Sequence, residues 1–177
     1  MIVVSDSSPL HYLIQINKVE ILHTLFGEVI IPASVREELE CPSAPKEVRK
    51  WLKSPPTWAK FCNAAVINTS LTLGKGEREA ICLVLELNAD LLLVDDKKAR
   101  RIAENHGLTE TGIIGILRAA YDRGLVKLPE AIRELIQCGF RLSEKLAQHI
   151  CSEQINKPND IGASSSASDS DESGLVD

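Results

Sequence analysis

The sequence has few aromatic residues and no long apolar run, and each shortage excludes a class of protein. Aromatic side chains make up 4% of the 177 residues, which argues against a base-stacking platform as the mode of nucleic-acid binding. No run approaches the roughly 20 apolar residues needed to span a bilayer. The first ten residues, MIVVSDSSPL, lack the basic region and the long apolar stretch of a signal peptide. We therefore expect a cytoplasmic protein with no membrane partner.

The cysteines and histidines also lack the spacing of metal or disulfide sites. The five cysteines are Cys41, Cys62, Cys82, Cys138 and Cys151. Their odd number and the absence of any CxxC or histidine-spaced pair disfavour both a disulfide framework and a zinc site. The four histidines form no ligand pattern, so we expect them at the surface or hydrogen-bonded. The thiols should be reduced and mostly buried.

The net charge of −5 is concentrated at the carboxyl end. Residues 158–177 contain five acidic residues and no lysine or arginine, so the rest of the chain is close to neutral. A neutral body still permits a local basic rim, and global charge does not exclude a nucleic-acid partner. From about Asn156 onward the Ser, Ala and Asp bias cannot bury enough apolar surface to offset the entropy of ordering. We expect one domain over residues 1–155 and a disordered acidic tail over 156–177.

Short apolar runs alternate with helical patterns along the domain. The expected strands are Ile2–Val4, Val29–Ile31, Ala64–Ile67 and Leu91–Val94. The expected helices begin at Ser8–Pro9 and after Pro32, and continue with 47–52, 77–87, 97–106, 113–121, 129–136 and 143–150. Ser8 is suited to the N-cap of the first helix and Pro9 to its first position. This order predicts an α/β fold, a three-layer sandwich around a mostly parallel central sheet, with a helix-rich C-terminal part.

Four acidic residues from separate segments are expected at one edge of this sheet. Asp6 and Asp95 each follow an apolar strand directly, at the end where parallel sheets bind ligands. Glu38 lies on the helix after the second strand, and Glu77 lies in the first turn of the helix after the Gly74–Gly76 loop. Carboxylates brought together repel unless a cation lies between them. Oxygen ligands without His or Cys select Mg²⁺ or Mn²⁺ over zinc, and such a metal supports hydrolysis of phosphodiesters by nucleases.

Each acid also has a purely structural interpretation when taken alone. Asp6 is placed to cap the following helix, Glu38 to be solvated, and Glu77 to favour its helix dipole. Asp95 and Asp96 are both placed to cap the helix from residue 97. The joint order of the four acids along alternating strands and helices favours the metal-site interpretation.

Four stretches resemble the PIN-domain family, and within it the small prokaryotic proteins related to toxins of toxin–antitoxin pairs. They are residues 2–10 (IVVSDSSPL), 31–39 (IPASVREEL), 73–81 (LGKGEREAI) and 92–100 (LLVDDKKAR). The similarity continues through residues 112–124. It implies a hydrolase, a Mg²⁺- or Mn²⁺-dependent endoribonuclease that cuts single-stranded RNA, with a possible antitoxin partner and a homodimeric state.

The resemblance assigns site residues one by one. It places the first acid on Asp6, with Ser8 as the hydroxyl two residues later, and the helix glutamate on Glu38. The third acid of the family is usually an aspartate, whereas this chain has Glu77 or Glu79.

Helix geometry favours Glu77 as the third acid, because residues two apart point to nearly opposite sides of a helix. Glu77 lies four residues before Ile81, on the edge of the expected buried face, and Glu79 should point farther away from Ile81. The fourth acid is Asp95, or Asp96 if the register differs by one residue.

A basic cluster follows the proposed site. Lys97, Lys98, Arg100 and Arg101 are candidates for binding RNA phosphates beside the metal, although a charge run on a helix is usually a solvated face.

Three other functions compete with the nuclease. A PIN-like fold with a weak or inactive site would act as a protein-binding module, which the glutamate at the third acidic position leaves open. A phosphoacceptor receiver domain needs an acidic pair after the first strand, whereas here the pair comes late. A phosphatase of the haloacid-dehalogenase type needs an aspartate at position 8, where Ser8 stands.

Overall fold

The computed structural model describes residues 1–143, 145, 147, 148 and 150. The expected tail, residues 156–177, lies outside the described residues, as does part of the expected helix over 143–150. Among the described helices, none is both long enough and apolar enough to cross a bilayer.

The protein has an α/β fold built on one five-stranded sheet. Its strands are β1 (Val3–Ser5), β2 (Val29–Pro32), β3 (Ala59–Cys62), β4 (Leu91–Leu93) and β5 (Glu110–Thr111). They are ordered β3-β2-β1-β4-β5, and every neighbouring pair is parallel. The mostly parallel sheet expected from the sequence is therefore confirmed, and all five strands direct their carboxyl ends to the same edge.

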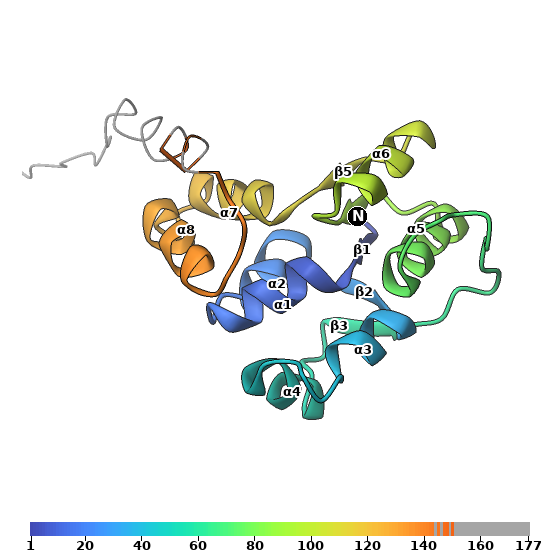
Figure 1. The fold of residues 1–177 in the computed structure, drawn as a ribbon, viewed down its shortest axis with the longest axis horizontal. Coiled ribbons are helices and arrows are strands. Elements are labelled where there is room, and N and C mark those ends of the chain that lie inside the picture. Colours follow the sequence, from blue (N-terminus) through green and yellow to red (C-terminus); the bar gives the residue numbers. More distant parts are fainter. Residues whose placement is uncertain (144, 146, 149, 151–177) are drawn as a thin grey trace, which may run out of the picture.

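Eight helices in the described residues connect and extend the strands. They are α1 (Ser7–Gln15), α2 (Glu20–Phe26), α3 (Ala33–Leu39), α4 (Lys46–Lys53), α5 (Lys75–Leu87), α6 (Lys97–Asn105), α7 (Ile113–Asp122) and α8 (Leu128–Gln137). Figure 1 shows α5 on one side of the strands, with α1, α2, α7 and α8 on the other.

Two hydrophobic cores lie on the two faces of the sheet, as the period of two along a strand requires. Val3 of β1 and Leu93 of β4 face a core formed with α1–α4, α7 and α8. Val4 of β1 and Leu92 of β4 face the opposite core, formed with α5 and α6. The sheet is thus covered on both faces, which gives the three layers expected from the sequence.

The structure corrects the position of the third strand. The strand is β3, Ala59–Cys62, and Ala64–Ile67 lies in the loop that follows it. The β-branched Val66 in that loop is 76% exposed, so its apolar character does not reflect burial in the sheet. β3 is an edge strand and only Ala59 in it is buried, which explains why it lacks a clear apolar run.

Candidate metal-binding active site

The ends of β1 and β4 bring Asp6 and Asp95 to the same edge of the sheet. Ser5 pairs in register with Leu93, and the backbone N–H of Asp6 donates to the Leu93 carbonyl at 2.9 Å. Each aspartate then leaves its strand within two residues of this bond. Both acids are therefore positioned by the central strand β1 and its neighbour β4.

Asp6 is buried at this edge without a full set of partners. Asp6 is 1% exposed, and its Oδ1 has no hydrogen-bond partner in the described structure. Asp6 is the residue that precedes α1, in place of the Ser8 cap expected from the sequence, but its side chain forms no capping hydrogen bond. A buried and unpartnered carboxylate oxygen is costly, so this position calls for a cation or a proton.

The pKa of Asp6 is shifted in the direction expected for such a buried carboxylate. The pKa of Asp6 is raised to about 7, chiefly by burial and to a smaller extent by the negative charges of Glu77 and Glu38. The backbone N–H groups of Ser7 and Ser8 oppose this shift. The three acids therefore lie close enough to interact through their charges.

Glu38 is held in place by the first turn of α5. The backbone N–H of Gly76 donates to Glu38 Oε1 at 2.9 Å. A Cβ at position 76 would lie 2.8 Å from Glu38 Oε2, which is closer than real Cβ contacts allow. A glycine at position 76 is thus required for Glu38 to approach the helix end.

Glu77 belongs to the same group of charges. Burial raises its pKa, and the charges of Asp96 and Glu38 add to the increase. The Gly74 backbone N–H, which donates to Glu77 Oε2 at 3.0 Å, and the Lys98 ammonium oppose it. Glu77 therefore lies between Glu38 and the segment that follows β4.

Glu79, which was expected to point farther away from Ile81 than Glu77 does, is buried and has different contacts from Glu77. It is 7% exposed and accepts hydrogen bonds from the Ser34 backbone N–H at 2.8 Å, from the Ser34 hydroxyl and from the Ala64 N–H at 3.1 Å. Ser34 lies in the first turn of α3, the helix that carries Glu38. Glu79 of α5 thus caps α3, while Glu38 of α3 caps α5.

Asp95 holds the start of α7. Its Oδ1 accepts from the Ile113 backbone N–H at 2.9 Å, and a Cβ on Gly112 would overlap this oxygen. Its Oδ2 is buried without a hydrogen-bond partner among the described residues. Burial raises the pKa of Asp95, the Ile113 N–H and the Arg100 charge lower it, and Glu110 raises it.

Asp96 is the N-cap of α6. Its Oδ1 accepts from the backbone N–H groups of Lys98 and Ala99 at 2.8 and 2.9 Å, which leaves its second oxygen free of such bonds. Its charge acts on Glu77. The two adjacent aspartates therefore both have one oxygen available, Asp95 from a buried position and Asp96 from an exposed one.

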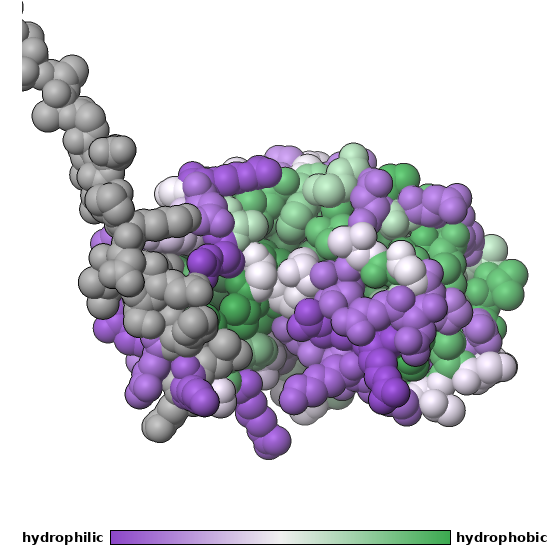
Figure 2. Space-filling view, turned by 90° about the horizontal axis from the view of Figure 1, so that it is seen from above, coloured by the Kyte–Doolittle hydropathy of each residue, from purple (hydrophilic) through white to green (hydrophobic). Residues whose placement is uncertain are grey.

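The basic residues after the site divide into two kinds. Arg100 forms a salt bridge with Glu110 at 2.7 Å, and Lys98 donates to the Thr72 carbonyl. Lys97 and Arg101 are exposed, one helical turn apart on α6. Figure 2 looks from above onto the side where α6 lies and shows hydrophilic residues gathered there.

The side chains at this edge fit a hard divalent cation. Their donors are carboxylate oxygens, and two of these oxygens, Asp6 Oδ1 and Asp95 Oδ2, are buried and unpartnered in the described structure. Such oxygens suit Mg²⁺ or Mn²⁺. In the described part of the chain, no three His, Cys, Asp or Glu residues are already arranged as a complete ligand set.

Comparison with known families agrees with the fold. A model of the PIN domain matches residues 2–156, and the chain belongs to the PIN-domain family. PIN domains are typically nucleases and generally bind divalent metal ions. A search of curated proteins and a search of solved structures gave no match.

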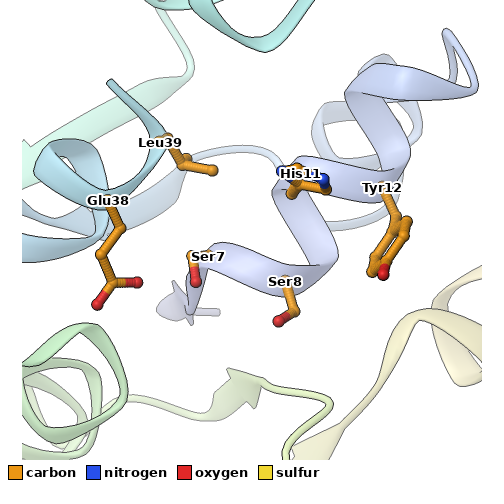
Figure 3. Close-up of a pocket in the computed structure, with 6 residues that line it drawn as sticks. All are labelled: Ser7, Ser8, His11, Tyr12, Glu38 and Leu39. Carbon is orange, nitrogen blue, oxygen red and sulfur yellow. The ribbon is translucent and has the colours of Figure 1, made fainter. Parts of the chain in front are cut away.

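Beside the acids lies a pocket that combines Ser8 and Glu38, both named from the sequence, with residues that the sequence did not point to. A pocket of about 240 Å³ is lined by Ser7, Ser8, His11, Tyr12, Glu38 and Leu39 (Figure 3). Ser8, His11 and Tyr12 are three and four residues apart on α1, so they share one face of the helix. This spacing is visible in the sequence, but only the fold shows that the face lies next to Glu38.

Proposed function

We propose that this protein is a metal-dependent endoribonuclease that hydrolyses phosphodiester bonds in single-stranded RNA. The observation that carries the proposal is the buried Asp6 carboxylate, whose Oδ1 has no hydrogen-bond partner in the described structure and whose pKa is raised partly by the charges of Glu77 and Glu38. The proposed ligands of Mg²⁺ or Mn²⁺ are Asp6, Glu38, Glu77 and Asp95, with Asp96 as the alternative fourth ligand.

The protein residues then have distinct tasks. A divalent metal held here would supply an activated water and neutralise charge on the phosphate oxygens. The buried Asp6 carboxyl would release its proton to solvent and hold the metal as a carboxylate. The Gly76 N–H holds Glu38 in position, and Lys97 and Arg101 are exposed cations suited to neighbouring phosphates.

The resemblance to toxin-like PIN domains supports pairing with an antitoxin and formation of a homodimer, and we propose both on that ground alone.

Cleavage of a mixed RNA pool by the full-length protein tests the nuclease proposal. We expect cleavage with Mg²⁺ or Mn²⁺, none with EDTA, and none for Asp6→Asn with either metal. The matched control for Asp6→Asn is Glu104→Gln, because Glu104 is exposed on α6. Asp122 is unsuitable as a control because its side chain has interactions of its own.

Cleavage in EDTA would overturn the metal mechanism. A folded protein that does not cut RNA with either metal would instead favour the alternative, a PIN-fold protein with a weak or inactive site that acts as a protein-binding module.

A further inference from the structure

The pocket beside Glu38 is lined by side chains that, apart from Glu38 itself, are not proposed metal ligands. Figure 3 shows the Glu38 carboxylate and the hydroxyls of Ser7 and Ser8 pointing to the same side, with His11 and Tyr12 farther along α1. Because Glu38 belongs both to this pocket and to the group of acids, the pocket opens next to the proposed metal. A ligand in it would lie beside the reacting phosphate.

The pocket walls offer hydrogen bonds and ring surface. The hydroxyls of Ser7 and Ser8 form no hydrogen bond with any residue that the structure describes. Burial lowers the pKa of His11, although the Gln15 side chain opposes the shift. The imidazole is therefore neutral at physiological pH, with one nitrogen that donates and one that accepts.

Two aromatic contacts fix the orientation of Tyr12. Its ring meets His11 edge-on, with centroids 5.2 Å apart, and meets Phe140 edge-on at 5.0 Å. These contacts restrain Tyr12 between two rings before any ligand binds. Apart from Glu38, none of the six residues that line the pocket carries a permanent charge.

We propose that this pocket binds one unstacked nucleobase of single-stranded RNA, from the nucleotide next to the phosphate that is cut. Proteins recognise such bases by aromatic contact and by hydrogen bonds to their edges, and this pocket supplies both through His11, Tyr12 and the two serines. Its volume of about 240 Å³ lies below the roughly 300 Å³ at which pockets for drug-sized ligands begin, which suits one base. The proposal rests on the proposed function, since it names the substrate of the same site.

The low aromatic content of the chain agrees with a single subsite. A platform that stacks successive bases needs several exposed rings, whereas one pocket needs only the rings found here. Base selection would then act at one position relative to the cut. RNA duplexes would be excluded because their bases remain stacked and paired.

The position of cleavage in a random single-stranded RNA pool tests the proposal. We expect wild-type protein to prefer particular bases at one position beside the cut, and His11→Ala to weaken that preference about fivefold or more. The matched control is His106→Ala, because His106 is exposed at the end of α6 and outside the pocket. Tyr12→Phe keeps the ring and serves as a second variant if His11→Ala does not fold.

A binding measurement separates this proposal from the nuclease proposal. Fluorescence anisotropy with a labelled eight-nucleotide RNA, in Ca²⁺, reports binding whether or not the protein cuts. We expect tighter binding of the single strand than of the duplex, and a loss of about fivefold or more for His11→Ala. If the wild type does not cut but shows this dependence on His11, the nuclease proposal fails and the pocket survives. Equal base preferences or equal affinities for wild type and His11→Ala would overturn the pocket.

Discussion

Glu77 and Glu79 lie two residues apart on α5 and have different environments. Glu77 is influenced by the charges of Glu38 and Asp96, whereas Glu79 is saturated by donors from Ser34 and Ala64. A carboxylate that already accepts three hydrogen bonds would have to give some of them up in order to bind a metal. The distinction between a ligand and a structural glutamate therefore rests on contacts that the two residues do not share.

The two glutamates should respond oppositely when neutralised. We expect Glu77→Gln to lower cleavage by orders of magnitude and to change the free energy of unfolding in EDTA by less than about 1 kcal/mol. Glu79→Gln should cost about 1–3 kcal/mol of stability, because an amide NH₂ would face backbone donors, while most cleavage activity persists. Urea unfolding in EDTA and single-turnover cleavage measure the two effects. The opposite pattern would move the third ligand to Glu79.

Asp95 and Asp96 can be separated in the same way. We expect Asp95→Asn to lower Mn²⁺ affinity more than tenfold, since its buried Oδ2 would lose its charge. Asp96→Asn should leave both stability and Mn²⁺ affinity nearly unchanged, because Asn is as good an N-cap as Asp. Mn²⁺ titration followed by calorimetry measures both. A large loss of affinity only for Asp96→Asn would make Asp96 the fourth ligand.

At the residue scale, the sequence predicts which acids lie near the sheet edge better than it predicts their partners. Asp6 and Asp95 follow directly from the ends of apolar strands. The burial of Glu79 could not be predicted from α5 alone, because it depends on donors at the start of α3 and in the loop after β3. A helical pattern describes the residues on one helix, and it contains no information about which neighbouring helix end needs an acceptor.

At the scale of elements, α3 and α5 are joined by reciprocal caps. Glu79 of α5 accepts from the first turn of α3, and Glu38 of α3 accepts from the first turn of α5. The Ser34 hydroxyl also donates to the Lys75 carbonyl at 3.2 Å. Both helix ends gain acceptors for N–H groups that have no partner within the helix. The same bonds fix the distance between Glu38 and Glu77.

A methyl group at position 76 should disrupt this pair of helices. We expect Gly76→Ala to displace the Glu38 carboxylate, since the added Cβ would lie 2.8 Å from Oε2, and to lower cleavage at least tenfold. The better helix propensity of alanine, about 1 kcal/mol in a helix interior, should partly offset the loss of stability. The measurements are initial cleavage rates and thermal melts in EDTA.

Gly74→Ala is the matched control for this substitution. A Cβ at position 74 would make an ordinary contact of 3.4 Å with Glu77 Oε2, and the residue has negative φ. Its activity should remain within a few-fold of wild type. Equal losses in both variants would show that the loop as a whole, and not the approach of Glu38, is sensitive to added bulk.

Elements with strong patterns were predicted well, and short ones at the edges were not. Helices α5 and α7 lie within two residues of their expected bounds. The sequence analysis did not anticipate α2 or β5. β5 has two residues and depends on pairing with β4, so its own sequence carries almost no strand signal. The third strand was predicted in the wrong place because Val66 is apolar but exposed, and apolar character does not report burial directly.

For the whole molecule, the acids gathered at one sheet edge are suited to a metal ion but destabilise the fold when no metal is bound. Folding removes Asp6 from water and brings other negative charges toward it. Such a cost is typical of sites whose charge is balanced only by a ligand. A metal that binds the folded state alone then stabilises the entire domain through mass action.

The dependence of unfolding on pH should reveal this cost through Asp6. The pKa of Asp6 is about 7 in the folded protein, against 3.8 for the free side chain. Between these values the folded state holds a proton that the unfolded state has released, so stability in EDTA should fall as pH rises from about 4 to 7. The contribution is on the order of 2–4 kcal/mol.

The Asp6→Asn variant tests this prediction. We expect it to lack this dependence on pH and to equal or exceed wild type in stability at pH 7.5 in EDTA. Saturating Mn²⁺ should reverse the order, because only wild type keeps the ligand charge. Urea unfolding of both proteins at pH 5 and 7.5, with EDTA or Mn²⁺, provides the four comparisons. If Asp6→Asn is strongly destabilised in EDTA at pH 7.5, Asp6 is a structural residue of the β1–α1 junction, and its carboxylate does not act as a metal ligand.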